Sequence, residues 1–352
     1  MRTERTGFPR PMCPTCGEQS ACRASGQVKD DYPRCHRPLL GTSLDRMADL
    51  LAWWNRFHGC GGDSRLGDLQ RALLTRLATD RMRFSEVFEP SWSHDGDGWH
   101  FWRFSYAFPG FRNDPTSDMR DLLAFCRPFG DELTGQVRTL LSPVLDPAVF
   151  LPLLGLAYDT PTSWRVKLYL QFRDDAGDEP LRVASRLTGR TDLHRLFRKR
   201  SLHLVGIDLG AHGIAGAKLY FLQPRIPSRD VPRGGRPVEL IEYLTNAGLD
   251  ELRNLLVIHR MRRRDDPYLE NPAELDFALQ DNDLCWEDLA ASPTLRKVRR
   301  GESPSPLATL ESGFRIGVRR ISVSVGGTEK LTVYYVPTEV DDRPGRLLVV
   351  SC

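Results

Sequence analysis

Hydrophobic and polar residues alternate along three segments of the chain, as is typical of β-strands with two different faces. In residues 164–172, Val166 and Leu168 lie on the apolar side, whereas Lys167 and Tyr169 lie on the polar side. Each of the other two segments also places a lysine and a tyrosine on its polar side. These pairs are Lys218 with Tyr220 and Lys330 with Tyr334. Three predicted strands therefore repeat a lysine and a tyrosine at even spacing on one face.

The rest of the pattern predicts helices that alternate with paired strands. The expected helical regions are about 43–57, 66–79, 118–155 with breaks at its prolines, 191–200 and most of 238–289. The expected strands are 84–108 with an internal turn, 164–172, 202–209, 215–222, 314–325 and 331–337. Strands joined by tight turns are antiparallel, and helices between the pairs must cover one face of the sheet. The order predicts an α+β protein.

Composition narrows the possible partners. The 352 residues carry 49 basic and 46 acidic side chains, and this net charge of +3 is too small to indicate nucleic-acid binding. Basic clusters at 198–200, 260–264 and 296–300 are interpreted as solvated helix ends. No apolar run is long enough to span a bilayer, and no glycine-rich nucleotide motif follows a strand. We expect a cytoplasmic protein with no membrane span and no nucleic-acid partner.

Four of the eight cysteines lie near the start of the chain. The two-residue spacer between Cys13 and Cys16 fits a zinc knuckle, but Cys22 and Cys35 are 13 positions apart and do not form a second one. A flexible tail with incidental thiols is therefore favoured, and structural zinc stays an alternative. We expect a cysteine-containing extension over 1–41, a main domain over 42–340 and a C-terminal tail over 341–352.

The polar face of the lysine–tyrosine strands has two interpretations. It can be the wet face of an ordinary antiparallel sheet, or it can line the inside of a closed barrel. The repeated pairing of lysine with tyrosine favours the barrel. Ammonium groups hold phosphate oxygens, and aromatic rings stabilise an organic cation while excluding water. Together these groups point to an allylic diphosphate as substrate.

Four segments resemble the aromatic prenyltransferases of the ABBA-barrel type, both the dimethylallyltryptophan synthase branch and the enzymes that prenylate cyclic ribosomal peptides. They are Glu89-Pro90-Ser91-Trp92, Trp102-Arg103-Phe104, the strands around Lys167 and Lys218, and Ile321–Ser324 followed by Leu331–Tyr335. The resemblance extends from about Ser43 to Pro337.

The resemblance implies an αββα barrel of ten antiparallel strands, with helices outside and a central chamber. It implies transfer of a dimethylallyl or longer prenyl group to an indole or phenol, free or within a peptide. No cofactor is obligatory, no metal-ligating residue is assigned, and magnesium is an option. The implied diphosphate ligands are Arg103, Lys167 and Lys218, the implied cation shield is Tyr169, Tyr220 and Tyr334, and the implied proton acceptor is Glu89.

Other interpretations stay open. Glu89 can be a turn residue before Pro90, and the tyrosines can simply bridge core and water. No further lysine-x-tyrosine strand is evident between Arg225 and Ser312, and the aspartate-rich run 174–178 is typical of a surface loop. The competing functions are a zinc-knuckle binding protein and a non-catalytic barrel for a hydrophobic ligand.

Overall fold

The structure of the protein is a computed structural model. It describes residues 88–293 and 315–338, with gaps at 96–97, 108–114, 128–129, 142–148, 161–162, 199, 211–212, 232–235, 247, 262–265, 268, 283, 285–288, 290–291 and 326–329. The helices expected over 43–57 and 66–79, and the cysteine segment with its zinc alternative, lie outside the described residues.

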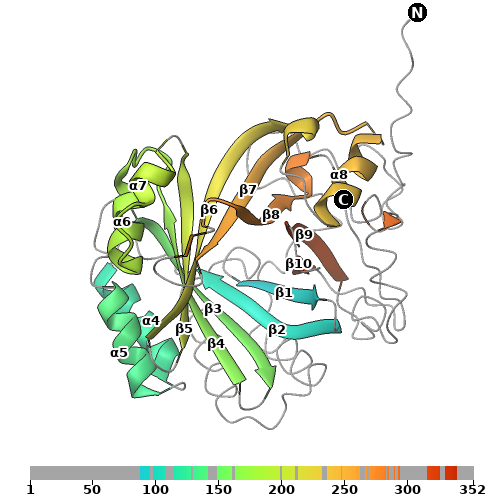
Figure 1. The fold of residues 1–352 in the computed structure, drawn as a ribbon. Coiled ribbons are helices and arrows are strands. Elements are labelled where there is room, and N and C mark those ends of the chain that lie inside the picture. The colour runs from blue at the N-terminus through green and yellow to red at the C-terminus, as the bar shows by residue number, and fades with distance from the viewer. Residues whose placement is uncertain are drawn as a thin grey trace, which may run out of the picture.

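The described residues form ten β-strands whose pairing closes into a barrel (Figure 1). They are β1 (Phe88–Asp95), β2 (Gly98–Ala107), β3 (Val149–Thr160), β4 (Ser163–Phe172), β5 (Leu202–Gly210), β6 (Gly213–Pro227), β7 (Glu251–Met261), β8 (Pro272–Ala278), β9 (Arg315–Ser324) and β10 (Leu331–Thr338). Every strand runs antiparallel to its neighbours, and β1 pairs with β10 as well as with β2. A buried hydrogen bond of 2.8 Å between the Ser93 and Thr332 hydroxyls reinforces this closing pair.

Helices lie between the strand pairs and pack outside the sheet (Figure 1). They are α4 (Pro115–Cys126), α5 (Asp131–Leu141), α6 (Glu179–Thr188), α7 (Leu193–Leu196) and α8 (Arg236–Asn246), with short 3₁₀ turns at Ser228–Asp230 and Gln280–Asn282. Helices α5 and α6 contact β5, and α8 contacts β9. Among the described helices, none combines the length and the apolar character needed to cross a membrane.

The main core lies between the helices and the outer face of the sheet. Beneath α8, for example, Leu240 and Leu244 pack in one cluster with Val257 of β7 and Phe277 of β8. Full burial of a large apolar side chain contributes about 1.5–3 kcal/mol, so this layer holds the helices onto the barrel.

The opposite, polar face of the sheet is also buried. Lys167 is 7% exposed, Lys218 is 5% exposed and Thr332 is 2% exposed. Leu168 and Leu219, which follow the two lysines and point to the other face, are fully buried in the outer core. Both faces can be buried only because the sheet curls and its polar face turns inward. The curled antiparallel sheet with outer helices is confirmed, and the interpretation of a wet polar face is wrong.

Two helical predictions are wrong. Residues 149–155 belong to β3. In the described part of 238–289 the predicted continuous helix is interrupted, because α8 ends at Asn246 and the strands β7 and β8 follow it. In β7 the run Leu255–Ile258 is buried on both faces of the sheet. A strand buried on both sides shows continuous apolar residues, and such a run cannot be distinguished from a buried helix by periodicity. The basic residue Arg260, predicted at a helix end, therefore lies in a strand.

Two glycines make room for Tyr169 on the inner face. A Cβ atom added at Gly155 would lie 2.7 Å from the Tyr169 ring, and one added at Gly206 would lie 2.8 Å from it. Gly155 is in β3 and Gly206 is in β5, the two strands that flank Tyr169 in the ladder. The tyrosine ring thus rests on strand positions that carry no side chain.

The variant Gly206→Ala should force the Tyr169 ring to move and should lower the free energy of unfolding by about 1–3 kcal/mol, which is typical of overpacking. The measurement is chemical denaturation monitored by circular dichroism. Gly135→Ala on α5 is the matched control, because no atom lies within 4 Å of its added Cβ. Alanine at this helical position should stabilise the protein by about 0.5–1 kcal/mol. Equal stability of Gly206→Ala and the wild type would contradict this account of the inner face.

Candidate functional site

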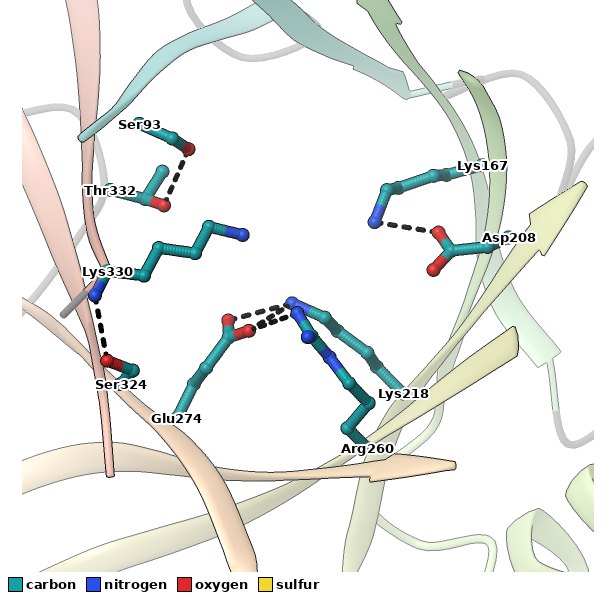
Figure 2. A network of polar contacts seen from close by, with 9 residues as sticks. All are labelled: Ser93, Lys167, Asp208, Lys218, Arg260, Glu274, Ser324, Lys330 and Thr332. Carbon is teal, nitrogen blue, oxygen red and sulfur yellow. Dashed lines mark hydrogen bonds and ion pairs between the residues drawn. The ribbon is translucent and has the colours of Figure 1, made fainter. Parts of the chain in front are cut away.

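Four basic side chains converge inside the barrel from different strands. Lys167 extends from β4, Lys218 from β6 and Arg260 from β7, while Lys330 directly precedes β10. Figure 2 shows their charged ends pointing toward a common space. Lys218 stands opposite Arg260 in the ladder, so their side chains share the inner face. The even spacing seen in the sequence thus brings cations together that are distant along the chain.

Two carboxylates lie among these cations (Figure 2). Lys218 Nζ donates to both carboxylate oxygens of Glu274 at 2.7 Å, and Arg260 donates to Glu274 Oε1 at 2.9 Å. Lys167 Nζ lies 2.7 Å from Asp208 Oδ1. We call this group the lysine cluster, and its members are Lys167, Asp208, Lys218, Arg260, Glu274 and Lys330.

The lysine cluster keeps both carboxylates ionised. Burial by itself would raise the pKa of Glu274, but the combined attraction of Lys218, Lys330 and Arg260 outweighs burial and holds this pKa far below its usual range. Burial also opposes ionisation of Asp208, and its partner Lys167 lowers the pKa of Asp208 overall. The strong positive potential at Glu274 is the property that an anion-binding site needs.

An aromatic wall adjoins the lysine cluster. The rings of Tyr169 and Tyr220 meet edge to face, with centroids 6.2 Å apart. Tyr220 also packs against Leu256 and Ile258. Burial, and then the neighbouring tyrosines, raise the pKa of Tyr220 well above its ordinary value, so the phenol stays neutral. A neutral ring with apolar neighbours can lie against an organic cation without reacting with it.

A second charged group surrounds Arg320 of β9. Arg320 donates to Asp276 Oδ1 from Nη2 at 2.6 Å and from Nε at 2.9 Å, and its guanidinium lies 5.8 Å from the centre of the Tyr334 ring. Glu89 lies close enough to act electrostatically on both Arg320 and Asp276. We call Glu89, Asp276, Arg320 and Tyr334 the Arg320 cluster. Burial raises the pKa of Asp276 to about 6 in spite of its arginine partner.

The structure brings most of the predicted site residues to the inner face. Lys167, Lys218, Tyr169 and Tyr220 lie in or beside the lysine cluster, whereas Glu89 and Tyr334 belong to the Arg320 cluster. These positions follow from the contacts given above. Arg103 lies in β2 opposite Ser91 and Ala157, and its side chain is outside the described part of the structure.

Several residues of the site escape prediction from the sequence. They are Arg260, Glu274, Asp276 and Arg320, of which the first three come from the region interpreted as helical. One signal was present, because residues 273–277 alternate between apolar and acidic side chains, with Glu274 and Asp276 opposite Leu275 and Phe277. The alternation gives the two faces of β8, but it does not show that β8 lies beside Lys218.

The described residues contain no group of three or more histidine, cysteine, aspartate or glutamate side chains suited to a metal ion. In the aspartate-rich run, Asp174 and Asp175 are exposed in the turn after β4, and Asp178 precedes α6. Arg173 donates to Asp175 at 3.1 Å. The interpretation of this run as a surface loop is confirmed.

Comparisons with known proteins give matches of structure only. No model of a known protein family matches the chain, and no curated protein matches its sequence. One similar solved structure is the prenyltransferase PriB in a ternary complex with L-tryptophan and dimethylallyl thiolodiphosphate. It is 19% identical, covers 88% of this chain and 100% of its own, and has a TM-score of 0.57.

Two dimethylallyltryptophan synthases give similar results. The 6-dimethylallyltryptophan synthase from Micromonospora olivasterospora, in complex with DMASPP and Trp, is 15% identical, covers 84% of this chain and 98% of its own, and has a TM-score of 0.59. The 5-dimethylallyltryptophan synthase from Streptomyces coelicolor is 15% identical, covers 83% of this chain and 97% of its own, and has a TM-score of 0.54. At this low identity the likeness concerns the fold. The resemblance predicted from the strand motifs is confirmed at that level: the chain has the fold of the aromatic prenyltransferases.

Proposed function

We propose that the protein transfers a prenyl group from an allylic diphosphate to an electron-rich aromatic ring. The observation that carries the proposal is the convergence of buried cations, in the lysine cluster, beside the neutral rings of Tyr169 and Tyr220. The proposal requires that the inside of the ten-stranded barrel encloses a chamber for both substrates.

In the first step the bond between the allylic carbon and the diphosphate oxygen breaks, and the electron pair leaves with the diphosphate. Lys167, Lys218 and Arg103 would bind the diphosphate oxygens, and Arg260 extends the same positive wall. Fixed positive charge stabilises the departing diphosphate more than the intact donor, so it accelerates ionisation. Magnesium would assist as a counter-ion of the diphosphate, and its effect is measured in the assay below.

The allylic cation must then survive until the acceptor attacks. The faces of Tyr169, Tyr220 and Tyr334 would stabilise it by cation–π attraction and would exclude water that would quench it. The edge-to-face pair of the half-buried Tyr169 and the buried Tyr220 supports this role, because both rings are held in place by the packing of the inner face.

The acceptor forms the new bond through a ring carbon, a nitrogen or an oxygen, and it loses a proton. Glu89 would accept this proton, since a carboxylate beside the acceptor increases its nucleophilicity as positive charge develops. Complexes of the similar PriB and the Micromonospora enzyme contain tryptophan, which makes indole the first acceptor class to test. Phenols and aromatic residues within peptides are the other acceptor classes.

A barrel that only binds an apolar ligand is the competing function. The charged lining formed by Lys218, Glu274 and Lys167 disfavours it, since an apolar ligand gains no attraction from charges that are already paired within the protein. The other alternative, a zinc-knuckle binding protein, depends on cysteines that lie outside the described residues. Metal analysis of the wild type and of the Cys13→Ser and Cys16→Ser variants tests it.

The deciding experiment is incubation of the protein with labelled dimethylallyl diphosphate and a panel of indole, phenol and peptide acceptors, with and without magnesium. We expect the wild type to transfer label and Lys218→Ala to lose transfer by about 100-fold or more, through weaker diphosphate binding and slower ionisation. Arg229→Ala removes an arginine whose side chain is 81% exposed, and it is the control with unchanged activity. No transfer to any acceptor, together with no diphosphate binding, would contradict the proposal. Apolar-ligand binding that is equal in wild type and Lys218→Ala would favour the competing function.

Glu89→Gln should keep the affinity for pyrophosphate but lose transfer by about two to four powers of ten, because the amide cannot accept the acceptor proton. Pyrophosphate affinity is measured by calorimetry, and transfer by product formation under single-turnover conditions. Equal losses of affinity and transfer, with a lowered melting temperature, would show that Glu89 has a structural role instead.

A further inference from the structure

Strand β8 departs from the pattern of the other strands that line the site. β4 and β6 each present a lysine followed two residues later by a tyrosine, and Lys330 stands two residues before Thr332 at the start of β10. At the corresponding inner-face positions β8 presents two carboxylates, Glu274 and Asp276, which are 6% and 2% exposed. β8 thus contributes negative charge beside Lys218 and Arg260, as Asp208 of β5 does beside Lys167.

Glu274 occupies the place that an anion would take among the cations. Both of its oxygens accept from Lys218 Nζ at 2.7 Å, and one also accepts from Arg260 at 2.9 Å. Lys330 adds further attraction, as the lowered pKa of Glu274 reflects. Figure 2 shows this carboxylate facing the ends of Lys218 and Arg260, with Lys330 extending into the space on another side of it. The chain's own carboxylate therefore satisfies Lys218 and Arg260, two of the basic groups that the proposed function assigns to the diphosphate.

A diphosphate cannot bind Lys218 while this arrangement persists. The side chains of Lys218 and Glu274 are each 7% exposed, and Lys218 directs its ammonium group at Glu274. A second anion placed beside the buried carboxylate would be repelled strongly, because charges interact strongly where water is excluded. Arg260, whose side chain is 36% exposed, is the more accessible of the two cations that hold Glu274, so we expect phosphate oxygens to reach it first.

We propose that Glu274 is an internal counter-ion that the diphosphate displaces from Lys218 and Arg260. This inference rests on the proposed function and names a residue that sets the affinity of the donor site. In the free protein Glu274 neutralises the buried cations and holds them in position. A diphosphate can replace it because its several oxygens satisfy both cations together, and the returning carboxylate then competes with bound diphosphate and favours product release.

The test compares the affinity for inorganic pyrophosphate in wild type and Glu274→Gln, by calorimetry at fixed pH and ionic strength without divalent ions. The amide is similar in size but carries no charge, so Glu274→Gln should bind pyrophosphate about tenfold or more tightly than the wild type. Glu274→Ala should show the same gain in pyrophosphate affinity. If Glu274→Gln does not fold, Glu274→Ala is used in its place. Circular dichroism confirms folding in each case.

Asp276→Asn is the matched control. It removes a carboxylate from the same strand and face, with similar burial and an arginine partner, but Asp276 pairs with Arg320 instead of Lys218. It should change pyrophosphate affinity by less than about threefold, because its charge is farther from the cations. An equal gain in Asp276→Asn and Glu274→Gln would overturn the specific role of Glu274.

The failures of the two proposals are distinguishable. In one outcome the wild type transfers a prenyl group and binds pyrophosphate, but Glu274→Gln has the same affinity for pyrophosphate as the wild type, or a lower one. The counter-ion role is then wrong and the proposed function stands. If the wild type and the folded Glu274 variants all fail to bind pyrophosphate, and no acceptor is prenylated, both proposals are wrong.

Discussion

The ion pair between Lys218 and Glu274 joins three neighbouring strands inside the barrel. Lys218 lies on β6, Glu274 on β8, and Arg260 on the strand between them binds the same carboxylate. Loss of one partner of a buried pair costs about 3–5 kcal/mol, because an uncompensated charge is left in a medium that solvates it poorly. The inner face can therefore be charged only where strand order and register provide each charge with a partner.

This requirement explains how stability and chemistry coexist in the interior. The outer face of the same strands is apolar and packs against the helices, so it holds the fold without help from the charges. The inner face is then available for the lysine cluster, the tyrosine rings and the Arg320 cluster. Tyr220 lies close enough to both charged groups that Glu274 and Tyr334 each help to raise its pKa. Donor and acceptor chemistry would thus meet at an aromatic wall.

The strands with simple alternation were predicted well from the sequence. Residues 164–172 and 215–222 lie in β4 and β6 with the expected faces. Charged residues that alternate with apolar ones indicate a strand with one polar and one apolar face. Strand β7 was missed because its run Leu255–Ile258 is buried on both faces and lacks this contrast. The error concealed Arg260, whose basic neighbours in sequence suggested a solvated helix end.

The sequence by itself determined which side chains share a face, as with Lys167 and Tyr169, because side-chain direction in a strand depends only on the count of residues. The tertiary structure decided which strands are neighbours, and it placed Glu274 against Lys218, 56 positions away in the chain. Such pairing depends on strand order, register and the closure of the sheet. These are non-local properties, and no local pattern of hydrophobic and polar residues contains them.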